Sequence, residues 1–413
     1  MQSLAQSSNL HKSAEECVLS FPGVVAAIIF SCGPFMYATI FNHGLFLYLA
    51  ILFIFSVFIQ AFFLDKNHSL RLKPSLGLQP LFFMFCVCLF WQLLSFLWSS
   101  SLSVSNIYSY IKVMLFFLLL SIPRYTERDK RLMLIMQTVI ICIANYMMLI
   151  QAETIMQAGS ERLTFSFFGV PQDPNYLAFF YVTPMVVLFS MMIATKRPFF
   201  LRLFSAFLIL FLLYGLLRTG SRGALAGISL ALIVYFICHK KTAWWKAVLF
   251  VLIGLLFILV LLTQGLSLLP KSVAERFSLN SIISTGGAGR TDIWLKYLIA
   301  IFSNRFILIF GAGNSSGQPN LNMSAHNYII ESWYEYGLIG IALLSIFFFI
   351  LIRATLKKKN NLSFSIIVGA LSIAAFLSVG RMLPFWLCLT LATVLSLPTK
   401  AEDKKSYYPP NKF

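Results

Sequence analysis

Residues 327–352 read NYIIESWYEYGLIGIALLSIFFFILI, and this apolar run decides the class of fold. Its only charged side chains, Glu331 and Glu335, both lie near its beginning. About 20 consecutive apolar residues are enough for a helix to cross the hydrocarbon core of a bilayer. The run therefore predicts a membrane-spanning helix, and one histidine, His326, stands directly before it.

The rest of the 413-residue chain repeats this pattern. Hydrophobic residues make up 59% and charged residues only 11%, whereas soluble domains carry about 25% charged residues. The apolar runs predict about twelve transmembrane helices in one polytopic membrane domain, residues 1–413, and thus an all-α integral membrane protein. The predicted spans are 18–41, 45–64, 78–98, 107–122, 132–151, 176–195, 203–219, 223–238, 247–266, 327–352, 363–380 and 384–398.

Positive charges define the orientation. The net charge is +18, and Lys and Arg cluster in alternate loops near 66–73, 124–131, 196–202, 240–246 and 353–359 and in the tail. Twelve spans put all of these segments on one side, which the positive-inside rule makes cytoplasmic, together with both termini. This orientation explains the basic character of the chain without a nucleic-acid partner.

The opposite face keeps cations that the positive-inside rule does not explain. They are Arg162, Arg218, Arg222, Lys271, Arg276, Arg290, Lys296, Arg305 and Arg381. An electropositive outer face indicates an anionic ligand. The longest outer loop, 267–326, lies between the ninth and tenth spans and is too long for a simple connection. Within it, residues 292–302 predict an amphipathic helix that places Trp294, Tyr297 and Leu298 at the membrane interface.

Two arginine motifs are candidate anion sites. LLRTGSRGALAG (216–227) puts Arg218 and Arg222 one helical turn apart, beside glycines that allow the backbone to break. GRTDIW (289–294) puts Arg290 at the start of a helix. Guanidinium groups bind phosphate oxygens in pairs of hydrogen bonds. The alternative is structural: arginines at helix ends often extend toward lipid phosphates without further function.

Three polar positions complete the candidates. In DPN (173–175), Asp173 and Asn175 precede a span, although Asp173 can simply cap that helix ahead of Pro174. His326 has an unperturbed pKa of about 6.5, so near neutral pH it can accept a proton. Asn327 follows it at the start of the helix. An interfacial histidine without chemical function is the alternative interpretation of His326.

Together these motifs resemble a known family. DPN (173–175), TGSRGA (219–224), GRTDIW (289–294) and AHNYIIESWYEYGLIG (325–340) occur in the order seen in the bacterial O-antigen ligase and polymerase superfamily. The resemblance implies a lipid-linked glycosyltransferase (GT-C-like) helical bundle in the bacterial inner membrane. It also implies a large periplasmic loop between helices 9 and 10 and a periplasmic active site.

The resemblance also implies a reaction in lipopolysaccharide biosynthesis. Ligases of this family transfer a polysaccharide from undecaprenyl pyrophosphate to a sugar of lipid A–core, with no metal and no nucleotide sugar. Arg222 and Arg290 match the arginines that hold the pyrophosphate, with Arg218 or Arg276 as alternative counterparts. His326 matches the histidine that activates the acceptor hydroxyl. Arg218, Arg381, Asp173, Asn175 and Asn327 are expected to bind substrate.

The chemistry of the reaction is consistent with these residue types. Negative charge grows on the departing diphosphate, and fixed guanidinium groups stabilise it. A histidine base assists the hydroxyl, and a single displacement inverts the anomeric centre. Three alternatives stay open: a polymerase that uses the growing glycan as acceptor, a protein O-oligosaccharyltransferase, and a lipid-linked glycan transporter without chemistry.

Overall fold

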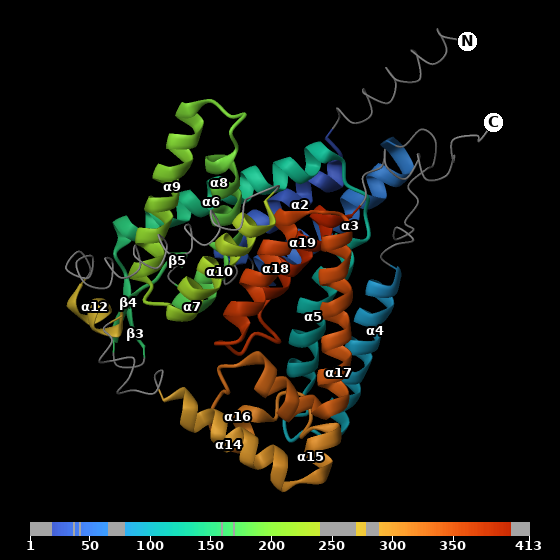
Figure 1. Ribbon diagram of the computed structural model, residues 1–413. Coiled ribbons are helices and arrows are strands. Elements are labelled where there is room, and N and C mark those ends of the chain that lie inside the picture. The colour runs from blue at the N-terminus through green and yellow to red at the C-terminus, as the bar shows by residue number, and fades with distance from the viewer. Residues whose placement is uncertain are drawn as a thin grey trace.

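The computed structural model describes residues 19–35, 38–40, 43–64, 79–157, 160–167, 170–239, 270–277 and 289–397. Most of these residues are helical (Figure 1). The longer helices are α2 (Phe21–Ser31), α3 (Leu45–Ile59), α4 (Gln79–Leu94), α5 (Val104–Ser121), α6 (Glu127–Gln151), α8 (Val182–Ile193), α9 (Phe199–Arg218), α10 (Arg222–Cys238), α14 (Arg290–Ser303), α17 (Tyr328–Lys357), α18 (Asn361–Ala374) and α19 (Leu383–Ser396). The shorter ones are α7 (Pro174–Phe179), α12 (Lys271–Phe277), α15 (Arg305–Phe310) and α16 (Gly317–Leu321).

Six helical segments are long and apolar enough to cross a membrane. They are Leu45–Phe62, Gln79–Trp98, Glu127–Gln151, Pro174–Ile193, Phe199–Arg218 and Tyr328–Lys357. Five shorter apolar helices accompany them in the described part of the chain. The predicted span 247–266, both chain ends and residues 267–269 and 278–288 of the loop lie outside the described residues, so the count of twelve spans stays a prediction.

Several predicted spans are shorter or broken in the structure. The helix predicted at 18–41 ends at Ser31, because Gly33 and Pro34 follow and proline cannot continue a helix. The helix predicted at 363–380 ends at Ala374. In contrast, α6 begins at Glu127, five residues before the predicted start. A capping box between Thr126 and Asp129 fixes that earlier beginning.

Helix α19 lies at the centre of the bundle. All but one of its residues are buried, and it packs against α5, α17 and α18. Its Trp386 belongs to an aromatic cluster with Phe85, Phe117 and Phe347, in which the Phe85 and Phe117 rings stack with centroids 4.4 Å apart. A helix that is apolar all around and buried on all sides is a core element of the bundle.

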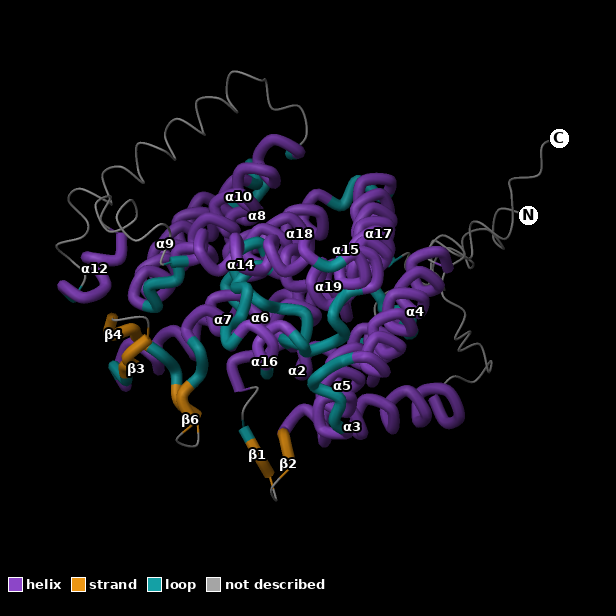
Figure 2. Tube along the Cα trace, turned by 90° about the horizontal axis from the view of Figure 1, so that it is seen from below, coloured by secondary structure: helices purple, strands orange, loops and turns teal. Residues whose placement is uncertain are grey.

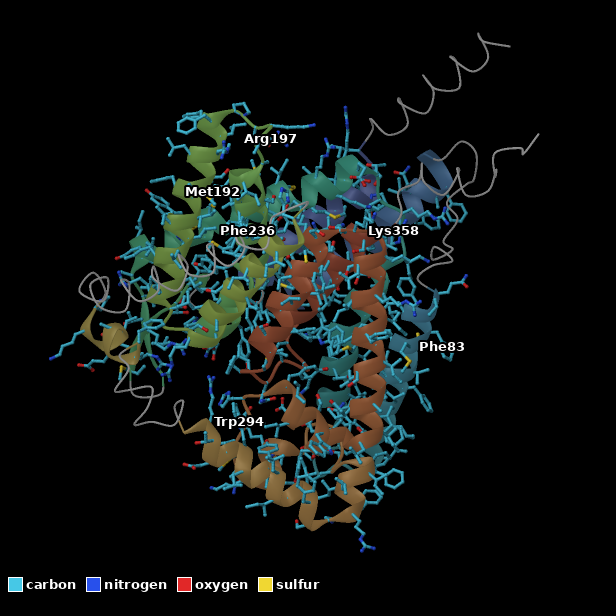
Figure 3. All side chains as sticks on the ribbon, viewed as in Figure 1. Phe83, Met192, Arg197, Phe236, Trp294 and Lys358 are labelled. Carbon is cyan, nitrogen blue, oxygen red and sulfur yellow. The ribbon has the colours of Figure 1, made fainter. Side chains whose placement is uncertain are left out.

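The outer surface is also apolar. On α4, Phe83 is 71% exposed and points away from the bundle (Figure 3), and Phe199 and Phe200 at the start of α9 are equally exposed. Exposed apolar area of this extent is unfavourable in water and favourable against lipid chains. The exposed side chains therefore agree with the apolar character of the six long helices.

Helix α17 is broken at Gly337, which has φ 66° and ψ −171°. The break frees backbone carbonyls, and the segment that follows α15 satisfies them. The amide of Ala312 donates to the carbonyl of Tyr334 at 2.7 Å, and the amide of Gly313 donates to the backbone carbonyl of Glu335 at 3.0 Å. The Trp91 indole donates to the carbonyl of Tyr336 at 3.0 Å. The break thereby attaches the layer formed by α14, α15 and α16 to one end of the bundle (Figure 1).

Short two-stranded hairpins lie at the edge of the molecule, one of them next to α12 and another beside the start of α3 (Figure 2). Strands β3 (Thr154–Gln157) and β4 (Ser160–Leu163) pair antiparallel, with Ile155 opposite Arg162. Strand β4 contacts α12. The other two-stranded pairs are β1 (Thr39–Ile40) with β2 (His43–Gly44), and β5 (Ser166–Phe167) with β6 (Val170–Pro171). The β3–β4 hairpin matters most, because it carries an arginine into the candidate site.

Candidate functional site

Arg162 joins three elements that are distant in the sequence. It lies on β4 and is only 1% exposed. Its Nε donates to the carbonyl of Thr219, at the turn between α9 and α10, at 2.7 Å. Its Nη2 donates to Oδ1 of Asn175, in α7, at 2.9 Å. A guanidinium held by two hydrogen bonds has a fixed position and direction.

The turn between α9 and α10 brings a second arginine against the first. Gly220 has φ 62°, and a Cβ placed there would lie 3.4 Å from Nε of both Arg162 and Arg276. Arg222 begins α10, and its Nη1 donates a long hydrogen bond of 3.4 Å to the carbonyl of Arg276. Helix α12, which carries Arg276, is thus held beside the turn between α9 and α10.

The guanidinium groups of this cluster influence one another. Burial, with Arg276 as the next cause, lowers the pKa of Arg162 to about 10. Burial also lowers the pKa of Arg276, with a contribution from Arg222, and that of Arg290, with contributions from Arg222 and Arg276. Arginine stays protonated at neutral pH despite such shifts. We call these four residues, Arg162, Arg222, Arg276 and Arg290, the arginine cluster.

Helix α14 connects the arginine cluster to the segment that contains His326. Arg290 is its first residue. Further along, the Trp294 indole donates to the carbonyl of Ala325 at 2.9 Å, and the Tyr297 hydroxyl donates to the carbonyl of Met323 at 2.8 Å. Figure 3 shows Trp294 on the side of α14 that faces the bundle. These two hydrogen bonds hold residues 323–325, which directly precede His326, against α14.

The face of α14 that packs on the protein differs from the sequence prediction. Trp294, Tyr297 and Leu298 were expected at the membrane interface, but Tyr297 is fully buried, Leu298 packs against the same cluster and Trp294 is half-buried. The exposed apolar side chains are instead Leu295, Ile299 and Phe302. The prediction is wrong for Tyr297, because both faces of this helix carry apolar residues and the hydrogen bonds of Trp294 and Tyr297 select the inner one.

His326 occupies the turn directly before α17. Its φ is 49°, and its backbone amide donates to Oγ of Ser378 at 3.0 Å. The side chain is exposed to solvent, but the protein around it still lowers the pKa of the imidazole below 6.5. The largest cause is desolvation of the ring by the surrounding protein. The charge of Arg290 lowers the pKa further, whereas the charge of Asp173 raises it. The ring is therefore neutral at neutral pH and able to accept a proton.

The DPN motif and Asn327 have structural roles. Asp173 caps α7 and accepts from the Asn175 amide at 2.7 Å. The Asn175 side chain accepts from Arg162, which places α7 against the arginine cluster. Asn327 caps α17, since its side chain accepts from the amides of Ile329 and Ile330. All three side chains therefore shape the site through local structure.

Two further candidates have contacts of a different kind. The Arg218 guanidinium lies over the ring of Tyr214 on its own helix and donates to the Tyr214 hydroxyl at 3.2 Å. Arg381, in the segment between α18 and α19, lines a polar pocket. The structure thus brings together Arg222, Arg290, His326, Asp173 and Asn175. It adds Arg162, which the sequence identified only as a cation predicted to face outward, and Arg276, which the sequence offered as an alternative counterpart of the pyrophosphate-binding arginines.

Residues 206–345 match the family model described as O-antigen ligase. This segment belongs to the O-antigen ligase superfamily. The match confirms the resemblance found in the motifs, and with the six apolar helices it indicates a membrane protein related to membrane glycosyltransferases. The O-antigen ligase segment contains Arg222, Arg276, Arg290 and His326, whereas Arg162 and Arg381 lie outside it. No curated protein matches the chain significantly.

Proposed function

We propose that the protein is an O-antigen ligase that transfers a glycan from undecaprenyl pyrophosphate to a sugar of lipid A–core. The observation that supports the proposal most is the match of residues 206–345 to the O-antigen ligase family model, together with the hydrogen bonds that join α14, which begins with Arg290, to the segment before His326. The reaction takes place at the periplasmic face of the bacterial inner membrane, both termini are cytoplasmic, and neither metal nor nucleotide takes part.

The arginine cluster acts on the donor. As the bond between the anomeric carbon and the phosphate oxygen breaks, negative charge accumulates on the leaving diphosphate. Arg222 and Arg290 bind its oxygens, while Arg162 and Arg276 raise the positive potential and hold the turn at Gly220 in place. Preorganised donors of this kind stabilise the transition state more than the ground state.

His326 acts on the acceptor. The acceptor oxygen attacks the anomeric carbon from the side opposite the diphosphate and loses its proton to the neutral imidazole. The diphosphate departs with the bonding electron pair, and the imidazolium then releases its proton to water. One displacement inverts the anomeric configuration, and general base catalysis of this type contributes about 10²–10⁴ in rate.

Transfer by the purified protein tests the proposal. The protein in detergent receives an undecaprenyl-pyrophosphate-linked glycan and lipid A–core, with EDTA and without ATP. We expect glycan-extended lipid A–core on a gel, lost in His326→Ala and retained in Arg305→Gln, whose arginine is exposed on α15.

Other outcomes identify the alternatives. Glycan extension of the donor itself, with lipid A–core unused, would identify a polymerase of the same superfamily. Donor binding without any transfer would favour a transporter and contradict the assignment of an enzyme.

A further inference from the structure

A polar pocket of about 490 Å³ opens beside the segment that carries His326. Pockets of roughly 300–1,000 Å³ accommodate small ligands. The lining is polar apart from one proline, and consists of Ser101, Asn106, Ser315, Gln318, Pro319, Asn322 and Arg381. Hydroxyl and amide groups of this kind offer both donors and acceptors, which is what the hydroxyls of a sugar ring require.

Two of the lining amides are available to a ligand. Gln318 and Asn322 are exposed at α16 and just after it, and their side chains make no hydrogen bond to the residues that the structure describes. Opposite them, the hydroxyl of Ser101 is engaged with the carbonyl of Ser315 at 2.8 Å, and Asn106 donates to the carbonyl of Ser101 at 2.9 Å. One wall of the pocket is therefore fixed, and the other presents two free amides.

The pocket is connected to His326 through Ser378. Oγ of Ser378 accepts from the His326 amide at 3.0 Å and lies 2.6 Å from Oγ of Ser324. Asn322 stands just ahead of Ser324, and Arg381 follows shortly after Ser378. The same two chain segments thus hold the backbone of His326 and one side of the pocket.

The pocket and the arginine cluster are formed by different residues: Asn322 and Arg381 line the pocket, whereas Arg290 begins α14. Arg290 lowers the pKa of His326, and the four arginines of the cluster influence one another. Arg381 lines the pocket, whereas none of the four arginines of the cluster does. In a direct displacement the acceptor enters opposite the leaving group, so the side away from the diphosphate belongs to the acceptor.

We infer that this pocket binds the sugar of the acceptor whose hydroxyl attacks the donor. The inference rests on the proposed function, which supplies the two substrates. Gln318 and Asn322 hydrogen-bond the ring hydroxyls, and Arg381 spans two neighbouring hydroxyls. The pocket sets the orientation of the acceptor, while His326 removes the proton.

Binding measurements test the inference without turnover. Calorimetry compares the wild type with the double variant Gln318→Ala/Asn322→Gly, in which glycine suits the φ of 55° at position 322. The probes are the deacylated core oligosaccharide and the undecaprenyl-pyrophosphate-linked glycan. Loss of two neutral hydrogen bonds should weaken core binding about tenfold and leave donor binding within about twofold. Gln151→Ala, an exposed glutamine at the end of α6, is the control.

Three results would overturn the inference: no binding of the core oligosaccharide to the wild type, equal binding to the double variant, or weakened binding of the donor instead. The last result would assign the pocket to the donor glycan. Binding of the core oligosaccharide through these amides without any transfer would support the acceptor pocket and refute the proposed function. The two failures are therefore distinguishable.

Discussion

Replacing Gly337 with alanine should destabilise the contact between α17 and the α14–α16 layer. The backbone at Gly337 has φ 66° and ψ −171°, a region that is essentially restricted to glycine and costs other residues about 1–3 kcal/mol. The added Cβ would also lie 2.2 Å from the carbonyl oxygen of Ile309 and 2.6 Å from the amide nitrogen of Gly311. These are backbone atoms that cannot rotate away, and overpacking of this kind costs about 1–3 kcal/mol more.

Two other glycines separate these effects. At Gly289 φ is 72°, and a Cβ would meet no described atom within 4 Å, so alanine there tests backbone strain alone, about 1–2 kcal/mol. At Gly44 φ is negative, and a Cβ likewise meets nothing within 4 Å. The expected order of destabilisation is Gly337→Ala, about 4 kcal/mol in total, then Gly289→Ala, then Gly44→Ala with little effect.

The assay is heating of the purified protein in detergent, followed by size-exclusion chromatography, together with hydrogen exchange. Gly337→Ala should lose the folded peak several degrees before Gly289→Ala. The amides of Ala312 and Gly313, which donate across the break in α17, should exchange faster only in the Gly337 variant. Equal stability of the two variants with unchanged exchange at these amides would refute the account of how α17 and the α14–α16 layer are joined.

Three other predictions concern the site. Arg162→Lys keeps the charge but loses the paired hydrogen bonds, so the transfer rate should fall about tenfold. The control Arg305→Lys should leave the rate unchanged. Equal rates in the two variants would show that Arg162 has no role in the site. Arg290→Gln removes a cation that lowers the pKa of His326, so the acid limb of the residual pH–rate profile should move to higher pH. An unmoved limb would show that the titration of His326 does not determine this part of the profile. Asn327→Ala should cost about 1 kcal/mol of stability, because it removes a helix cap. Asn327→Asp keeps a capping oxygen, so thermal unfolding and the transfer assay should both give wild-type values. Loss of transfer in the aspartate variant would mean that the amide contacts substrate.

The sequence predicts the helical class because spans are determined by local composition. A run such as 199–218 has one physical solution in lipid, a helix with its backbone hydrogen bonds satisfied internally. The ends of the helices were harder to predict. Gly337 has no local signal that separates a break from a simple packing glycine, since the break depends on the 309–313 segment that docks there.

The candidate site was only partly predictable for the same reason. Arg222, Arg290 and His326 stand in short motifs that a reader of the sequence can recognise. Arg162 does not, because its importance comes from hydrogen bonds to Thr219 and Asn175, which are distant in the chain. An arginine in an outward-facing segment was the only sequence signal for it. The face that α14 presents to the protein likewise depends on tertiary hydrogen bonds rather than on its own pattern.

The most direct test of the central claim is an experimental structure of the protein with an undecaprenyl-pyrophosphate-linked glycan bound. The account predicts that the diphosphate oxygens lie within hydrogen-bonding distance of Arg222 and Arg290, with the anomeric carbon directed toward His326. A diphosphate bound away from these arginines, or an imidazole separated from the anomeric carbon by the protein, would contradict it.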